Sequence, residues 1–267
     1  MLSRRHFLQL AGLAALPSTA WEAAAAPSLD TLKFVFSRPY DNPRTQWLIH
    51  VYQEICGRLG KGFEFVEVPA KRATAMVLAG EVDGELGRTY EYLLEFPTLV
   101  RIAEANNQVN FAAYAARAEV EFKAWPAVRE RNYFCEYRLG IQELESLLAK
   151  QLAPANVSAV RTIAQGLRKL QLGRADLYFD VEEAVSDFFY IGDEASELPA
   201  DPAVHQVAIV QSTTGHAYLH PSRANLADAM SANLRQMKRN GLVHQYLTEA
   251  LATYKRQHAS GPQGPPA

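Results

Sequence analysis

Apolar and polar positions in the first part of the chain follow two alternating patterns. Short apolar runs such as "LKFVFS" and "FEFVEV" are typical of strands, and between them "RTQWLIHVYQEICGRLG" has apolar residues along one helical face. The expected order is strand, helix, strand, helix and strand over residues 32–37, 44–60, 63–68, 70–80 and 82–88. This alternation predicts a parallel sheet that is covered by helices on both sides.

The same pattern starts again in the middle of the chain. The second series of strands and helices is expected over residues 109–117, 137–141, 142–152, 156–161, 162–173, 176–180, 181–189 and 204–211. The closing segment, residues 222–257, is purely helical. Its apolar stripe predicts core packing and consists of Leu226, Met230, Leu234 and Met237. Two α/β units of similar construction therefore share one chain.

Two stretches of these units, "LAGEVDGELGR" and "LQLGRADLYFD", are near copies of each other. In each, a glycine closes a helical pattern, an aspartate follows three residues later, and a short strand comes next. Gly80 and Gly173 can adopt the left-handed conformation that ends a helix. Asp83 and Asp176 suit the turn that follows. We expect these four residues to be structural rather than functional.

The two copies differ in the residue that ends the strand, which is Arg88 in the first and Asp180 in the second. In open α/β sheets the carboxyl ends of the strands face the ligand crevice. Arg88 is therefore a candidate binding residue, and so is Arg72, which lies just beyond another strand end. Asp180 is a third candidate.

The N-terminal segment is expected to be an export signal rather than part of the fold. It has an arginine pair, a modest apolar stretch and a run of alanines that suits cleavage near Ala25, and "SRRHFLQ" closely resembles the twin-arginine motif. An uncleaved membrane anchor is the weaker alternative, because the apolar stretch is far shorter than the roughly 20 residues that span a bilayer. We assign residues 1–25 to a signal peptide, exported by the twin-arginine translocase to the periplasm, and residues 259–267 to a disordered tail.

Composition limits the class of protein. The chain is 48% hydrophobic and 21% charged with a formal net charge of −2, which is typical of a soluble globular protein and leaves no basic excess for nucleic acid.

Cys56 and Cys135 lack C-x-x-C spacing and are expected to be buried free thiols rather than a disulfide. His205, His216 and His220 are close in sequence, but "HAYLHP" is typical of extended chain, so neither a metal site nor a cofactor is expected.

In the order and spacing of its segments, the chain resembles the periplasmic solute-binding proteins of family 3, which serve polar amino-acid ABC transporters. The resemblance rests on "LKFVFSRPY", "VPAKRATAMVLAGEVDG", "LRKLQLGRADLYFD" and "NLRQMKRNGLVHQY". It implies an α/β fold of two lobes (type II-like), joined by two crossing hinge strands, with the ligand cleft between the lobes. The first lobe would comprise residues 26–110 and 212–258 and the second residues 111–211, with crossings near Asn110 and Ser212.

The resemblance also implies how the ligand is held. In the family's amino-acid binders, the Asp that ends "GR-x-D-x-x-x-D" takes the ligand ammonium, and Asp180 occupies that position. The family's T-x-x-R arginine, which holds the ligand carboxylate, is missing, because the corresponding stretch reads "YLLE" with Glu95 in its place. We expect Arg88 or Arg72 to take over, since guanidinium and carboxylate form a planar, two-bond pair.

Further candidates lie at other strand ends. Ser37 and Tyr40 follow the first strand and can supply a hydroxyl and an aromatic wall. Arg161 and Thr162 end a strand and open a helix, whose free backbone N–H groups favour an anion. The alternatives stay open: Thr162 can simply cap the helix, and the first-lobe arginines can pair with surface acids such as Glu85.

The leading interpretation is a monomeric binding protein, not an enzyme, that captures a small polar solute for an ABC-type importer in the inner membrane. We expect the solute to be an amino acid or a related carboxylate. A ligand-sensing subunit for a membrane receptor and a periplasmic dehydratase or hydrolase that reuses the cleft are the alternatives. The sequence contains neither the G-x-S-x-G of a nucleophile elbow nor a phosphate-cradling G-x-x-x-x-G-K.

Overall fold

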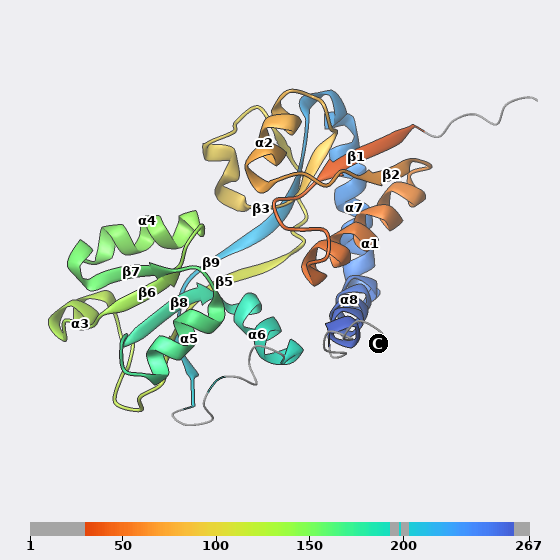
Figure 1. Ribbon diagram of the computed structural model, residues 1–267. Coiled ribbons are helices and arrows are strands. Elements are labelled where there is room, and N and C mark those ends of the chain that lie inside the picture. The colour runs from red at the N-terminus through yellow and green to blue at the C-terminus, as the bar shows by residue number, and fades with distance from the viewer. Residues whose placement is uncertain (1–29, 193–197, 199–202, 259–267) are drawn as a thin grey trace, which may run out of the picture.

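Two α/β lobes share one continuous nine-stranded sheet in the computed structural model (Figure 1), which describes residues 30–192, 198 and 203–258. The strand order is β2-β1-β3-β9-β5-β8-β6-β7, and β4 pairs with β9 off this path. The assigned signal peptide, residues 1–25, and the tail, residues 259–267, lie outside the described residues. No helix among the described residues is long and apolar enough to cross a membrane.

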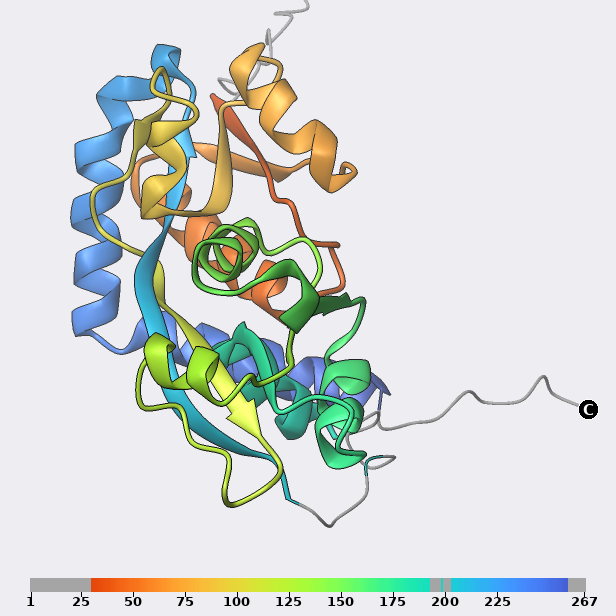
Figure 2. The same cartoon turned by 90° about the vertical axis from the view of Figure 1, so that its left-hand side faces the viewer.

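Each lobe has its own set of helices and strands (Figures 1 and 2). The first lobe contains β1 (Thr31–Val35), α1 (Pro43–Arg58), β2 (Gly62–Phe65), α2 (Ala70–Leu78), β3 (Gly84–Thr89), the 3-10 helix η1 (Tyr90–Leu94), β4 (Val100–Arg101), the 3-10 helix η4 (Pro221–Leu226), α7 (Ala227–Arg239) and α8 (Leu242–His258). The second lobe contains α3 (Trp125–Glu130), β6 (Cys135–Arg138), α4 (Gln142–Gln151), the 3-10 helix η2 (Pro154–Asn156), β7 (Val157–Val160), α5 (Ile163–Gln171), β8 (Leu177–Val181) and α6 (Glu182–Ile191).

Two long strands, β5 (Asn107–Ala115) and β9 (His205–Leu219), run through both lobes (Figure 1). They pair with each other in antiparallel register, and Asn110 lies opposite Ser212 where we expected the crossings. The sheet is therefore mixed: β1 pairs in parallel with β2 and β3, and β6 pairs in parallel with β7 and β8, as the alternation predicted, whereas the two linking strands are antiparallel. The reason is topological: the chain leaves the first lobe through β5 and returns through β9, so the two strands run in opposite directions.

The predicted elements of both lobes are present, with differences at a few boundaries. The strand expected to end at residue 211 continues to Leu219, and the first helix of the closing segment begins with the 3-10 turn η4 before α7. The short helix α3 and the two-residue strand β4 were not predicted. Both elements are shorter than the stretch over which the pattern is recognised, about 11 residues for a helix and about 4 for a strand, so the sequence pattern does not detect them.

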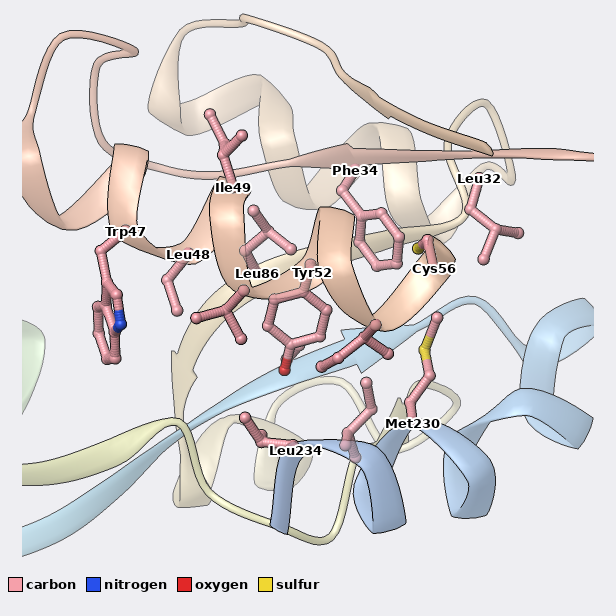
Figure 3. Close-up of a cluster of buried hydrophobic side chains, with 14 of the residues drawn as sticks. Leu32, Phe34, Trp47, Leu48, Ile49, Tyr52, Cys56, Leu86, Met230 and Leu234 are labelled. Atoms are coloured by element: carbon pink, nitrogen blue, oxygen red, sulfur yellow. The ribbon is translucent and has the colours of Figure 1, made fainter. Parts of the chain in front are cut away.

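The core of the first lobe lies between α1, the sheet and α7, as Figure 3 shows. Tyr52 and Leu86 are fully buried there, and Met230 and Leu234 of the predicted apolar stripe contact them from α7. A separate core in the second lobe packs β5, β8 and α4 together. Each lobe therefore has an apolar core of its own, and β5 and β9 link the two lobes.

The two near-copies have the same structural role, as predicted. The glycine of each copy has a positive φ, 71° in the first and 64° in the second. Asp83 accepts the main-chain N–H of Lys33 at 2.7 Å, and Asp176 accepts that of Phe134 at 2.7 Å. Each aspartate also pairs with an arginine side chain. Each copy therefore ties the turn after a helix to the neighbouring segment of its own lobe.

Cys56 and Cys135 are both free and fully buried, which confirms the expectation for the thiols. Burial raises the pKa of Cys56 to about 12 and that of Cys135 to about 12. Both thiols are therefore protonated and unreactive at neutral pH.

Candidate functional site

Charged side chains from both lobes come together where strand ends and helix starts meet. We call this group the interlobe charge cluster; its members are Arg38, Arg44, Arg138, Asp180, Glu183 and Asp187. Arg38 follows β1 and Arg44 lies in the first turn of α1, whereas the other members belong to β6, β8 and α6 of the second lobe. The cluster contains three guanidinium groups and three carboxylates, so the charge that is left for a ligand depends on which of these groups pair with each other.

Arg38 is the cation of this cluster whose side-chain donors are not used by another described residue. It is half-buried, and it makes no hydrogen bond or ion pair to another described residue; its guanidinium lies 5.7 Å from the ring centroid of Phe36. Desolvation lowers the pKa of Arg38, Glu183 opposes this shift, and the positive charge of Arg138 adds to it. Charges of both lobes therefore act on one guanidinium that has no direct partner in the described part of the chain, which suits the binding of an anion.

Asp180 is fully buried and already accepts four donors. Arg138 donates through Nε at 2.8 Å and through Nη2 at 2.7 Å, the main-chain N–H of Val181 donates at 2.6 Å, and the hydroxyl of Tyr178 also donates. A carboxylate offers about four lone-pair sites. The predicted binding of a ligand ammonium by Asp180 therefore requires that the ammonium displace one of these four donors.

Arg88 pairs with Glu85, the alternative left open from the sequence. Its Nη2 lies 2.6 Å from Glu85 Oε1 and donates to Thr74 Oγ1 at 3.1 Å, and its guanidinium lies 5.0 Å from the ring centroid of Tyr92. Glu85 is fully buried rather than a surface acid, and Tyr92 donates its hydroxyl to it at 3.1 Å. A binding role for Arg88 stays a prediction, and the pair with Glu85 competes with it.

The remaining predicted residues are spread over both lobes. Ser37 is half-buried next to Arg38, and the exposed Tyr40 packs against Phe65 with ring centroids 5.7 Å apart. Arg72 is exposed on the first turn of α2. None of these contacts assigns a ligand role.

At the end of β7, Thr162 caps α5 by accepting the N–H of Gln165 at 3.2 Å. The capping alternative for Thr162 is therefore confirmed. Arg161 is exposed beside it and lines a groove along α5 rather than joining the interlobe charge cluster.

Polar contacts between α1 and α6 hold the lobes in this arrangement. Arg44 donates to both carboxylate oxygens of Asp187, at 2.7 and 2.8 Å, and lies 3.6 Å from Glu183. At the other end of α6, the ammonium of Lys255 in α8 lies 4.7 Å from the ring centroid of Tyr190. These contacts tie α6 of the second lobe to α1 and α8 of the first.

Arg38 and Arg138 were missed from the sequence although a signal was present. Arg38 follows the first strand in "SRPY", where Ser37 and Tyr40 were chosen as candidates, and Arg138 ends β6. Arg88 became a candidate because the carboxyl ends of strands face the ligand crevice, and the same argument applies equally to Arg38 and Arg138.

His216 lies in β9 opposite Arg88 and is 3% exposed. Its Nδ1 donates to the carbonyl of Ile102 at 2.9 Å and its Nε2 accepts from the hydroxyl of Thr214 at 2.8 Å, as in a neutral imidazole. Burial lowers the pKa of His216 below its ordinary value of 6.5. A depressed pKa in the folded state gives stability that is complete above the unfolded pKa and is lost as the pH falls through the folded one.

We therefore expect the melting temperature to fall as the pH drops below about 6.5, where an unfolded histidine takes up a proton. In His216→Gln this fall should be smaller, because no imidazole is left to protonate. His244→Gln, on the exposed side of α8, is the matched control and should keep the wild-type slope. Melting curves between pH 7.5 and 5 test this, and an unchanged slope in His216→Gln would contradict it.

Comparison with known proteins finds a related sequence and solved structures with a related fold. No family model matches the chain. A protein of Shewanella oneidensis, described as uncharacterized, is 27% identical over 240 residues, which is 86% of this chain and 89% of the relative.

Solved structures with the same arrangement include proteins of different function. A histidine kinase sensor domain with similarity to periplasmic binding proteins superposes with a TM-score of 0.61 at 16% identity, covering 83% of this chain and 96% of that one. An amino acid ABC transporter substrate-binding protein from Streptococcus pneumoniae, bound to L-arginine, gives 0.58 at 12% identity, covering 84% and 95%. An ancestral amino acid-binding protein, a precursor of cyclohexadienyl dehydratase, gives 0.58 at 16% identity, covering 83% and 95%. The chain therefore has the two-lobed α/β fold of the periplasmic binding proteins.

Proposed function

We propose that the chain is a periplasmic solute-binding protein that holds a small carboxylate between its lobes and presents it to an ABC-type importer. The observation that carries the proposal is Arg38, a half-buried guanidinium of the first lobe that is exposed to the charges of the second and has no direct partner among the described residues. In this proposal the protein is exported by the twin-arginine translocase, acts as a monomer and returns its ligand unchanged.

The pairing within the interlobe charge cluster favours a carboxylate as the recognised group. Asp180 is occupied by Arg138, and Asp187 is occupied by Arg44. Glu183 accepts the side-chain amide of Asn107 at 2.7 Å. A ligand carboxylate on Arg38 would complete the set of pairs with a charge-assisted, two-bond contact. An amino acid satisfies this requirement, and so does the carboxylic acid that lacks the amine.

A sensor subunit is the second candidate, and the specific support for it is the similarity to a histidine kinase sensor domain. The same ligand contacts serve both functions, because both present a ligand-bound form to a membrane protein. A catalytic role is the third candidate. It differs from the other two in a direct observable, since an enzyme converts the ligand and a binding protein releases it intact.

A thermal-shift screen of the mature protein tests the proposal. The screen contains amino acids, the matching carboxylic acids without the amine, the matching amines without the carboxylate, and sugars. We expect carboxylates to raise the melting temperature, because a ligand at 100 times its dissociation constant adds about 2.7 kcal/mol to the stability. Stabilisation by amines or sugars alone would contradict the proposal, and chemical change of a stabilising ligand would favour the enzyme.

A further inference from the structure

A basic groove of about 550 Å³ lies on the second lobe, between α5 and β7. Four cationic side chains line it: Arg161 before α5, Arg168 and Lys169 in the last turn of α5, and Arg174 after it. None of the four belongs to the interlobe charge cluster. The groove is therefore a separate feature that the proposed function does not use.

Among the described residues, most of the positive charge of the groove is unpaired. Lys169 pairs with Glu136 of β6, which is 1% exposed, whereas Arg161, Arg168 and Arg174 are exposed and make no ion pair with another described residue. Cations in the last turn of a helix are explained by the helix dipole. That explanation does not extend to Arg161, which precedes the helix. Four cations and one carboxylate thus lie together on a chain whose net charge is −2.

The other wall of the groove is the open edge of the sheet. β7 is the last strand in the order and pairs only with β6 among the described residues. Successive residues of a strand point to opposite faces of the sheet. Ala159 and Val160 nevertheless both line the groove, so the groove runs along the edge of β7. The edge itself, "VSAV", carries no charge and no proline that would block pairing.

We propose that this groove binds an extended acidic peptide segment of a partner protein, which pairs with the edge of β7 and places its carboxylates on the arginines beside α5. This is recognition by addition of a strand, with side-chain charges giving the preference. The lengths match: α5 spans roughly 13 Å at 1.5 Å per residue, and a four-residue strand spans about the same. Arg161 and Arg174 flank opposite ends of α5, so an extended segment that lies along the groove can contact both.

Binding of a fluorescent peptide of alternating Glu and Val to the full mature chain tests the proposal. We expect saturable binding that weakens as salt is added, since exposed charge pairs are screened. The double variant Arg161→Glu/Arg168→Glu should bind about tenfold more weakly or worse, a loss of about 1.4 kcal/mol or more. Lys150→Glu, an exposed reversal on α4 of the same lobe, is the matched control and should bind as the wild type does.

Four outcomes would overturn the proposal. The double variant binds as tightly as the wild type, or a peptide with Lys in place of Glu binds equally well. Inorganic phosphate displaces the peptide at concentrations comparable with the peptide's own, which would make the groove a small-anion site. A peptide N-methylated at alternate residues binds without loss, which would exclude pairing with β7. Because both arginines are exposed, circular dichroism should confirm that the double variant is folded.

Discussion

Replacing Asp180 with alanine is expected to lower the free energy of unfolding by about 3 kcal/mol, the lower end of the cost of removing one partner of a buried ion pair. The variant leaves the two donors of Arg138, the hydroxyl of Tyr178 and the N–H of Val181 without their acceptor. The lower end applies because the side chain of Arg138 is 28% exposed and water can reach part of it. Desolvation lowers the pKa of Arg138, but Asp180 outweighs this effect and raises it overall.

Thermal unfolding of the mature protein measures this effect. For a protein of this size a loss of about 3 kcal/mol corresponds to a melting temperature lower by roughly 6 to 12 °C. Asp41→Ala is the matched control, because Asp41 is exposed and makes no hydrogen bond or ion pair with another described residue. It should melt within about 2 °C of the wild type.

The Asp180 variant also decides between two roles for the same carboxylate. If Asp180→Ala melts like the wild type, the pair with Arg138 is not maintained in solution, and Asp180 is available for a ligand ammonium as the family resemblance implies. If the variant is destabilised as expected, weaker ligand binding by it has a structural explanation. In that case Asp180→Ala cannot by itself identify an ammonium site.

Local features of the fold could be predicted from the sequence because their causes are local. A glycine after an apolar helical stripe ends the helix in both near-copies, and Asp83 and Asp176 tie the turn that follows. Arg88 and Asp180 were correctly placed on β3 and β8 for the same reason. The direction of β5 and β9 could not be predicted in this way, since it depends on where the chain returns.

Which charged residues pair with each other depends on contacts between strands. The alternation of apolar and polar residues along one strand does not reveal these contacts. Residues 85 and 88 of a regular strand point to opposite faces, yet Glu85 and Arg88 form an ion pair because the pairing of β3 with β9 shifts register between them. Arg138 and Asp180 meet because β6 and β8 are neighbours, with Tyr137 opposite Phe179 one position earlier. The ion pair between Arg138 and Asp180 could be predicted only if the order of the strands in the sheet were known.

Replacing Arg38 with alanine is expected to weaken binding of a carboxylate ligand by about tenfold to a hundredfold. A hydrogen bond to a charged group contributes roughly 1.5 to 3 kcal/mol, and 1.4 kcal/mol is a factor of ten in affinity. The unliganded variant should be at least as stable as the wild type, because Arg38 has no direct partner among the described residues and its desolvated charge is removed. Arg38→Lys keeps the charge but loses the planar fork, so its affinity should fall between the two.

Calorimetric titration with a carboxylate from the screen measures these affinities, and two further variants complete the comparison. Arg239→Ala, at the exposed end of α7, is the control and should bind as the wild type does. Arg88→Ala should lose stability, because it leaves the fully buried Glu85 without its cation. If Arg38→Ala binds as the wild type does while Arg88→Ala binds more weakly even at temperatures where it is fully folded, the carboxylate site is at Arg88. Loss of affinity in Arg38→Ala without loss of stability would instead assign the carboxylate to Arg38, since a merely structural role would change both.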